Sequence, residues 1–254
     1  MTQRITPLAP LRRHLRSALR AALARWAVAG RIDPMEPDTA LDNPAAPALG
    51  ELVRAGTLVH LRAHIPANRA AFQRWYADEE IANLLRHDLR PLNAVQSRGY
   101  FDTIILPLSA VGTCWAIHEA ATGRLIGSTA LTDFIGGDRR STLFRLVIGE
   151  KDCWGRGYGT EATRLAVEEA FARHGCTEVR LEVFRHNNRA IGAYRRVGFQ
   201  VTGEHIEYVG RDRYELHVVE MTLARAEYRV PSTAYPVPSA QCPAEETAET
   251  NEKP

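Results

Sequence analysis

A chain of 254 residues, 45% hydrophobic and 24% charged, is long enough for one sizeable domain with extensions and has the composition of a soluble globular protein. Its formal net charge of +2 gives no reason to expect a nucleic-acid partner. The four cysteines show no CxxC pair and no regular spacing, so neither a zinc site nor a disulfide framework is expected. No apolar run reaches the length of a membrane span, and the first residues do not read as a secretory signal. We therefore expect a cytoplasmic protein.

The two ends of the chain differ from its middle. Residues 1–30 carry apolar side chains at helical spacing, and every charged residue there is an arginine. A basic amphipathic helix of this kind suits an anionic membrane surface or a protein partner, and the alternative is a helical arm packed on its own domain or on a second copy. Prolines predict a linker over 31–55, and prolines with clustered glutamates predict a disordered acidic tail over 226–254. A folded domain is predicted over 56–225.

Apolar periodicity and turn residues predict the elements of this domain. In chain order they are a strand at 57–63, helices near 67–86 and 93–105, a hairpin of strands 114–118 and 124–134, a strand at 143–148, a helix at 158–174, a strand at 178–184, a short helix at 189–197, and strands at 199–201 and 213–223. The run 143–148 is nearly continuously apolar, which is typical of a strand covered on both faces. This order predicts an α/β domain with a mixed sheet and one central βαβ unit.

A glycine turn joins the strand 143–148 to the helix that follows it. Gly155, Gly157 and Gly159 alternate along this turn. A strand that enters a helix through glycines brings unpaired backbone N–H groups and the positive end of the helix dipole to one point, which favours an anion such as phosphate. The spacing excludes a P-loop and departs from the dinucleotide fingerprint GxGxxG.

Two blocks of sequence carry a family resemblance. The run from Ile148 to Ala162, which contains the glycine turn, resembles the acetyl-CoA loop of the GNAT N-acetyltransferase superfamily. The later run from Val183 to Ile191, with Tyr194 and Gly198-Phe199, resembles the next block of that family, in the branch of the ribosomal-protein-alanine acetyltransferases. The resemblance implies a GNAT-like, mostly antiparallel mixed sheet, acetyl-CoA as co-substrate and no metal. Trp154 departs from it, because the family pattern has Gln or Arg there.

The resemblance also implies which residues bind the donor. Backbone amides of the glycine turn would surround the CoA pyrophosphate, and the strand before the turn would offer backbone groups to the pantetheine arm. Asn187 matches a family position that contacts the cofactor, although capping the short helix explains it equally well. The implied cofactor-binding residues are Val147, Ile148, Arg156, Gly157, Tyr158, Gly159, Thr160 and Asn187.

For catalysis, the resemblance implies direct attack of a neutral amine on the acetyl thioester, with a base to take a proton and an acid to protonate the departing thiolate. Tyr194 matches the family tyrosine that often serves as the acid; packing the short helix is its alternative role. The base stays open among Glu150, Glu182, Asp133 and a chain of waters. The strand before the glycine turn lacks the carboxylate that many relatives carry.

The sequence therefore predicts an N-acetyltransferase that moves an acetyl group from acetyl-CoA to a primary amine, either a protein N-terminus or a small molecule. Two alternatives accompany this prediction: a GNAT-like module that binds acyl-CoA as a sensor without catalysis, and an enzyme that uses a longer acyl-CoA. The segments expected to contact the amine carry no motif that identifies it.

Overall fold

The computed structural model describes residues 49–136, 140–210 and 213–229, all within one compact unit. The predictions for residues 1–30, for most of the linker and for residues 230–254 fall outside this described part. No helix within it is long and apolar enough to span a membrane.

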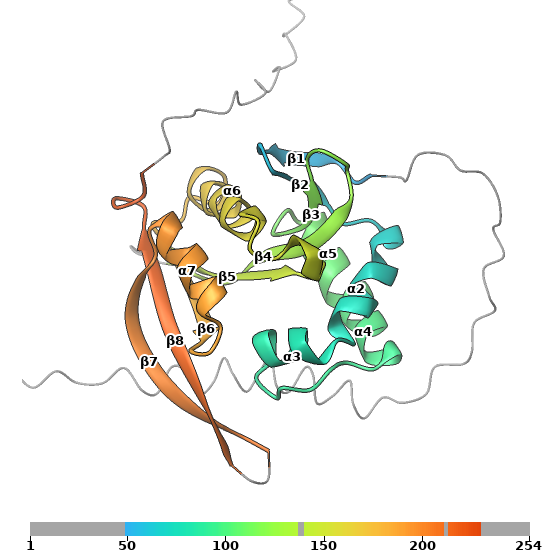
Figure 1. Cartoon of the computed structure of the whole chain (residues 1–254). Coiled ribbons are helices and arrows are strands. Elements are labelled where there is room, and N and C mark those ends of the chain that lie inside the picture. Colours follow the sequence, from blue (N-terminus) through green and yellow to red (C-terminus); the bar gives the residue numbers. More distant parts are fainter. Residues whose placement is uncertain (1–48, 137–139, 211–212, 230–254) are drawn as a thin grey trace, which may run out of the picture. The chain divides into compact units, whose positions relative to one another are not determined.

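One eight-stranded sheet organises the described residues, with the strand order β1-β2-β3-β4-β5-β6-β8-β7 (Figure 1). Neighbouring strands run antiparallel except β5 and β6, which are parallel. The helix α6 connects this parallel pair, so the predicted mixed sheet with a central βαβ unit is confirmed. The strands are β1 (Leu52–Ala55), β2 (Val59–Ala63), β3 (Cys114–Glu119), β4 (Leu125–Ile135), β5 (Ser141–Ile148), β6 (Glu178–Phe184), β7 (Gln200–Val209) and β8 (Tyr214–Ala224).

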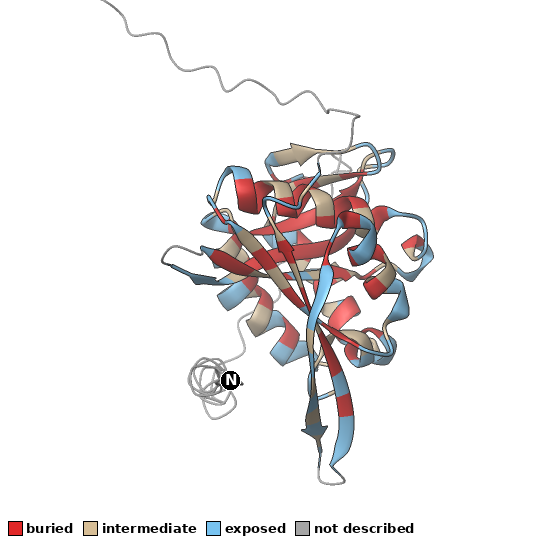
Figure 2. Cartoon of the chain, turned by 90° about the vertical axis from the view of Figure 1, so that its left-hand side faces the viewer, coloured by how far each residue is buried: buried red, intermediate tan, exposed pale blue. Residues whose placement is uncertain are grey.

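Helices cover both faces of the sheet (Figure 1). On one face lie α6 (Tyr158–Ala172) and α7 (Asn188–Val197). On the other lie α2 (Arg69–Tyr76), α3 (Glu79–Leu85), α4 (Ala94–Tyr100), a π-helical turn (Phe101–Ile105) and α5 (Leu106–Ala110). Strand β5 serves both layers, since Phe144 packs in the core beneath α6 and Val147 in the core beneath α2. The sheet accordingly forms a mostly buried layer between the helices (Figure 2).

The structure differs from the sequence prediction at two elements. The helix predicted over 67–86 is interrupted, because the Asp78 side chain accepts a hydrogen bond from the Ile81 amide (3.1 Å) and so caps a separate helix, α3. Strand β1 lies in the stretch predicted as a linker, so the sheet begins before residue 56.

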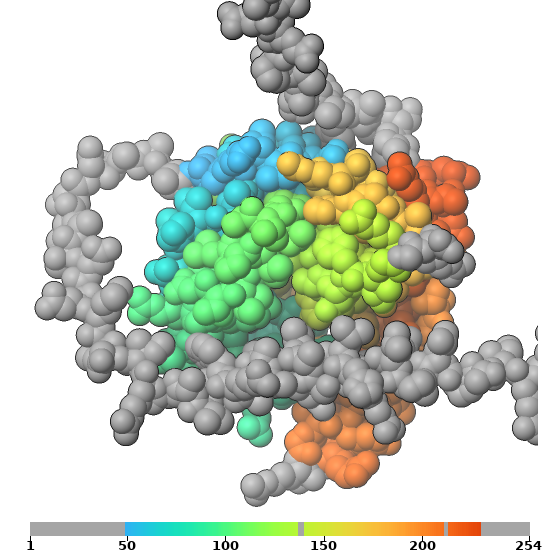
Figure 3. Space-filling view, turned by 180° about the vertical axis from the view of Figure 1, so that it is seen from behind, coloured from blue at the N-terminus to red at the C-terminus, as the bar shows by residue number. Residues whose placement is uncertain are grey.

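The last hairpin is also longer than predicted. Strand β7 continues to Val209 instead of ending at 201, because a bulge between Val201 and Gly203 and the glutamates that follow hide its alternation in the sequence. The hairpin β7–β8, orange in the views, projects from the rest of the domain (Figure 3). It carries exposed apolar side chains such as Ile206 and Tyr208.

A buried polar network joins the sheet to the helices α2–α5. The His64 ring, 7% exposed, lies 2.9 Å from the Ser128 hydroxyl through Nε2 and 3.3 Å from the Asn68 side chain through Nδ1. The ring packs edge-on against Phe101, with centroids 5.7 Å apart. Burial, with a smaller contribution from nearby His118, lowers the pKa of His64 to about 3. His64 is therefore neutral in the folded protein.

We predict that His64 makes the fold less stable in acid. The unfolded chain binds a proton at this histidine near its ordinary pKa, about 6.5, while the folded chain does so only near 3. Its stabilising contribution is therefore present above pH 6.5 and falls as the pH drops toward 3, by up to about 1.4 kcal/mol per pH unit. Denaturant titrations between these pH values measure the free energy of unfolding, which should fall less steeply with decreasing pH in His64→Gln than in wild type. The half-exposed His217 provides the control variant His217→Gln, which should behave as wild type. If the free energy falls equally steeply in all three proteins, the prediction is wrong.

Candidate functional site

The site begins where the sheet opens. Strands β5 and β6 pair at only three positions, which end at Leu143 and Arg180. Beyond these, β5 remains paired with β4 to Ile148, and β6 with β8 to Phe184. Strand β5 is thus held by β4 and strand β6 by β8, while the edges of β5 and β6 that face each other diverge. The pocket between them is lined by residues of both strands, the glycine turn, α3 and α7.

Backbone alternation determines which groups of β5 face this gap. The Thr129 hydroxyl on β4 hydrogen-bonds to the Arg145 carbonyl (2.9 Å), whereas the Ile148 carbonyl accepts a bond from the Trp154 indole (2.7 Å). The backbone N–H and C=O groups of the odd-numbered residues of β5 therefore point toward β4. Those of Phe144, Leu146 and Ile148 point into the gap. Of the two predicted strand contacts, Ile148 therefore turns its amide N–H toward the gap, whereas Val147 lines the pocket and packs in the core beneath α2.

The glycine turn places the start of α6 at one end of the pocket. Gly155 and Gly157 have φ values of +76° and +89°, which glycine adopts without strain, and Gly157 is the N-cap of α6. A Cβ atom on Gly157 would also lie 3.3 Å from a methyl group of Leu58. Gly159 and Thr160 line the pocket, so the unpaired amides of the first helical turn lie at its end.

Distant elements hold this turn in place. The buried Glu161 carboxylate on α6 accepts hydrogen bonds from the backbone amides of Thr57 (3.0 Å), Leu58 (2.5 Å) and Val59 (2.7 Å), which fastens the turn between β1 and β2 to the helix. Three short charge-assisted bonds on one buried carboxylate form a strong anchor.

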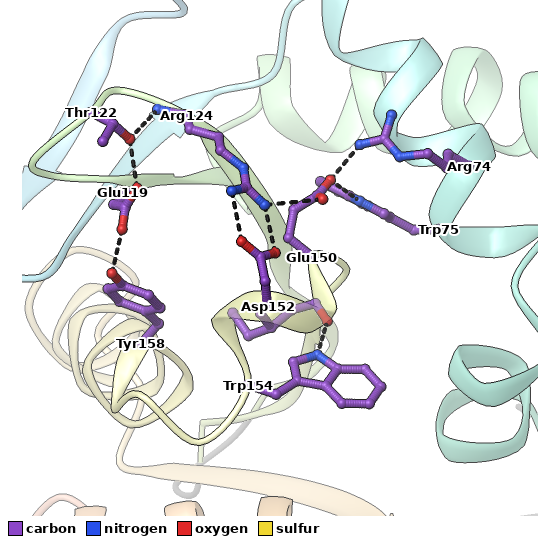
Figure 4. Close-up of polar contacts among 10 residues, drawn as sticks. Arg74, Trp75, Glu119, Thr122, Arg124, Glu150, Asp152, Trp154 and Tyr158 are labelled. Atoms are coloured by element: carbon purple, nitrogen blue, oxygen red, sulfur yellow. Dashed lines mark hydrogen bonds and ion pairs between the residues drawn. The ribbon is translucent and has the colours of Figure 1, made fainter.

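The β3–β4 hairpin supports the turn from the other side (Figure 4). Arg124 forms a bidentate ion pair with Asp152 (2.6 and 2.8 Å). The hydroxyl of Tyr158 donates to the Glu119 carboxylate, which also accepts a hydrogen bond from Thr122 (2.6 Å). The glycine turn is therefore held in place by contacts within the protein itself.

Comparison with known proteins identifies the family. A family model described as an acetyltransferase (GNAT) domain matches residues 59–200, more than half of the chain. The chain belongs to the GNAT acetyltransferase family. It is accordingly an acetyltransferase, and the predicted resemblance is confirmed.

Solved structures share the fold of this GNAT domain. Mycobacterium smegmatis RimJ in complex with CoA-disulfide is 18% identical, with a TM-score of 0.56 over 66% of this chain and 83% of that chain. Spermidine N-acetyltransferase from Vibrio cholerae, in complex with CoA and spermine, is 18% identical, with a TM-score of 0.57 over 67% of this chain and 98% of that chain. Ribosomal-protein-S5-alanine acetyltransferase from Vibrio fischeri is 9% identical, with a TM-score of 0.56 over 70% of this chain and 98% of that chain.

In this GNAT domain Tyr194 and Asn187 both line the pocket. Tyr194 is 7% exposed and meets Phe144 edge-on, with ring centroids 6.0 Å apart. Burial raises its pKa well above the ordinary value, so the phenol stays protonated at neutral pH. Within the described part of the chain no group hydrogen-bonds to its hydroxyl. The Asn187 side chain accepts a bond from the Ala190 amide (3.2 Å), which confirms that it caps α7.

The three carboxylates considered as bases lie in different places. Glu182 lines the pocket from β6. Glu150 lies in a separate hollow beside α2, where it accepts bonds from Trp75 (2.8 Å) and Arg74 (Figure 4). Burial opposes its ionisation, but these bonds and nearby arginines outweigh it, and the pKa of Glu150 lies below its usual range. Asp133 is exposed on β4, 3.9 Å from Arg145, and is not among the residues that line the pocket.

Glu182 has titratable neighbours. Ligand atoms of Glu182, His205 and Glu220 lie within 4.8 Å of one another, a spacing that would admit a metal ion. His205 lies 2.9 Å from the Glu220 carboxylate. Exposed acidic groups commonly lie this close without an ion, and this grouping leaves the expectation of no metal as it was.

The structure adds pocket residues that sequence reasoning missed. Helix α3 supplies an apolar wall of Ile81, Leu84 and Leu85, which looked like ordinary core residues in the sequence. Two predicted cofactor residues, Arg156 and Tyr158, are not among the residues that line the pocket; the Arg156 guanidinium lies 5.2 Å from the centre of the Tyr158 ring.

We predict that Glu161 is needed to hold the glycine turn. In Glu161→Gln an NH₂ group replaces one acceptor oxygen and faces a backbone N–H. The remaining hydrogen bonds then go to an uncharged acceptor. The free energy of unfolding should fall by about 2–4 kcal/mol, since each bond to a buried charged group contributes about 1.5–3 kcal/mol. Chemical denaturation measures this against Glu215→Gln, an exposed glutamate on β8, which should change stability little. Equal stability of the two variants would contradict the anchoring role.

Proposed function

We propose that this acetyltransferase moves the acetyl group of acetyl-CoA directly onto a primary amine bound at the opening between β5 and β6. The observation that carries the proposal is this opening itself, with unpaired backbone along β5, helix amides at one end and a protonated phenol in its wall. Relatives of the same fold were solved with CoA, and one of them with spermine.

The donor would lie along β5. Its pyrophosphate would accept hydrogen bonds from the backbone amides of residues 156–160, where the helix dipole favours negative charge. Its pantetheine arm is a flexible chain with amide groups, and it would pair with the inward-facing backbone of Leu146 and Ile148 as a strand does. Asn187 would approach the same arm from α7.

In the chemical step the amine nitrogen attacks the thioester carbonyl carbon, a C–N bond forms, and the C–S bond then breaks. The proton that the nitrogen loses passes to a base, and the sulfur leaves as a thiolate that receives a proton. We assign this second proton to the Tyr194 hydroxyl, because burial keeps it protonated and it lines the pocket. Among the three carboxylates, Glu182 is the base that the geometry favours, since Glu150 is engaged by arginines outside the pocket.

The acceptor class is tested directly by turnover. The full chain is incubated with acetyl-CoA and, separately, with polyamines, peptides that begin with alanine, and aminoglycosides, and the release of free CoA thiol is followed. Turnover with members of one group assigns the acceptor. Binding of CoA without turnover on any amine would contradict the proposed reaction, and a preference for a longer acyl-CoA would correct the donor.

We predict that Tyr194→Phe lowers kcat by about 10²–10⁴-fold, the usual contribution of a positioned acid, and leaves the dissociation constant of CoA unchanged. Tyr228→Phe is the control, because the Tyr228 hydroxyl bonds to Glu168 on α6 and is remote from the pocket lining. Steady-state kinetics and calorimetry provide the two constants. If kcat is the same in Tyr194→Phe and the control, Tyr194 is not the acid.

A further inference from the structure

Arg189 is one of three arginines that line the pocket, with Arg145 and Arg196, and the proposed reaction gives it no role. It lies exposed in the first turn of α7. Across the described ranges it forms no ion pair. The acid that acts on it is Glu80, whose carboxylate already pairs with Lys151 at 2.8 Å. Partial burial lowers the pKa of Arg189, and Glu80 opposes this shift.

The position of Arg189 is set by Trp154. The guanidinium carbon lies 3.6 Å from the centre of the indole ring, the distance of a stacked cation–π contact. The indole is fixed in turn, because its Nε1–H donates to the Ile148 carbonyl (2.7 Å). Trp154 thus links the end of β5, the glycine turn and the first turn of α7. A stacked guanidinium keeps the N–H groups at its edge available for in-plane hydrogen bonds.

We propose that Arg189, stacked on Trp154, binds a phosphate group of CoA, and that Trp154 is the residue that positions it. This inference rests on the proposed use of acetyl-CoA. Gly159 and Thr160 at the start of α6 and Arg189 at the start of α7 line the same pocket, so a phosphate there would meet both backbone amides and a guanidinium. Trp154, which departs from the family pattern, thereby acts through its neighbour instead of touching the phosphate.

The test measures dissociation constants of the full chain for CoA, 3′-dephospho-CoA and pantetheine by calorimetry. Arg189→Ala should weaken CoA binding by about 10- to 100-fold, as expected for a charge-assisted contact to phosphate, and Arg189→Lys should recover part of the loss. Arg195→Ala is the matched control, since Arg195 lies exposed on the same helix and is not among the residues that line the pocket.

Comparison of the three ligands identifies which phosphate Arg189 contacts. If Arg189→Ala loses affinity for CoA alone, Arg189 binds the 3′-phosphate. If it loses affinity equally for CoA and 3′-dephospho-CoA, Arg189 binds the pyrophosphate. In both cases the difference from wild type should shrink as salt rises from about 0.05 to about 0.5 M, because ions screen an exposed contact. A loss that extends to pantetheine, which has no phosphate, would overturn the proposal, because it would indicate general damage to the pocket.

Trp154 variants test the positioning role. Trp154→Phe keeps a ring under the guanidinium and should bind CoA better than Trp154→Ala. In the Trp154→Ala background the additional effect of Arg189→Ala should be smaller than in wild type, as expected when two residues act together. If Arg189→Ala weakens CoA binding as much in the Trp154→Ala background as in wild type, Trp154 does not position Arg189. Wild-type affinity for CoA in Arg189→Ala would overturn the whole inference. Failure of the wild-type chain to bind CoA at all would instead contradict the proposed function.

Discussion

The site depends on one constraint, the incomplete pairing of β5 with β6. The two strands are parallel and joined by α6, yet they share a ladder at only three positions, while each stays paired along its other edge with an antiparallel neighbour. The sheet therefore behaves as two parts, β1–β5 and β6–β8–β7, that meet at the base of a gap. Unpaired backbone inside a protein is costly unless something satisfies it. A ligand that resembles a strand meets that need, and the amides at the start of α6 complete the site at one end.

The sequence predicted the central part of this arrangement well. The apolar run of β5, the alternation of β6 and the glycines before α6 are local signals, and the structure places all three elements within two residues of the predicted bounds at either end. Tyr194 and Asn187 were found through a motif whose two blocks converge on one pocket. Of the carboxylates considered as the base, Glu182 is the one that lines this pocket.

Other features could not be read from the chain, because their meaning depends on residues far away. Glu161 looks like an ordinary helix-surface acid, and only the fold shows that three amides from the turn before β2 and the first residue of β2 converge on it. Arg189 looks like a solvated arginine until Trp154 is seen beneath it. The break before α3 and the length of β7 were missed because a side-chain cap and a bulge override the apolar pattern. Thus β5, β6 and the glycine turn carry sequence signals, whereas the residues that support the turn and the α3 wall are products of tertiary structure.

The most direct test of this account is a crystal structure of the full chain with CoA. The pantetheine arm is expected between β5 and β6, bonded to the backbone of Leu146 and Ile148, with a phosphate at the amides of residues 156–160. The sulfur is expected near the Tyr194 hydroxyl. CoA bound elsewhere, or β5 and β6 paired along their full length with the gap closed, would contradict the claim that the opening in the sheet is the donor site.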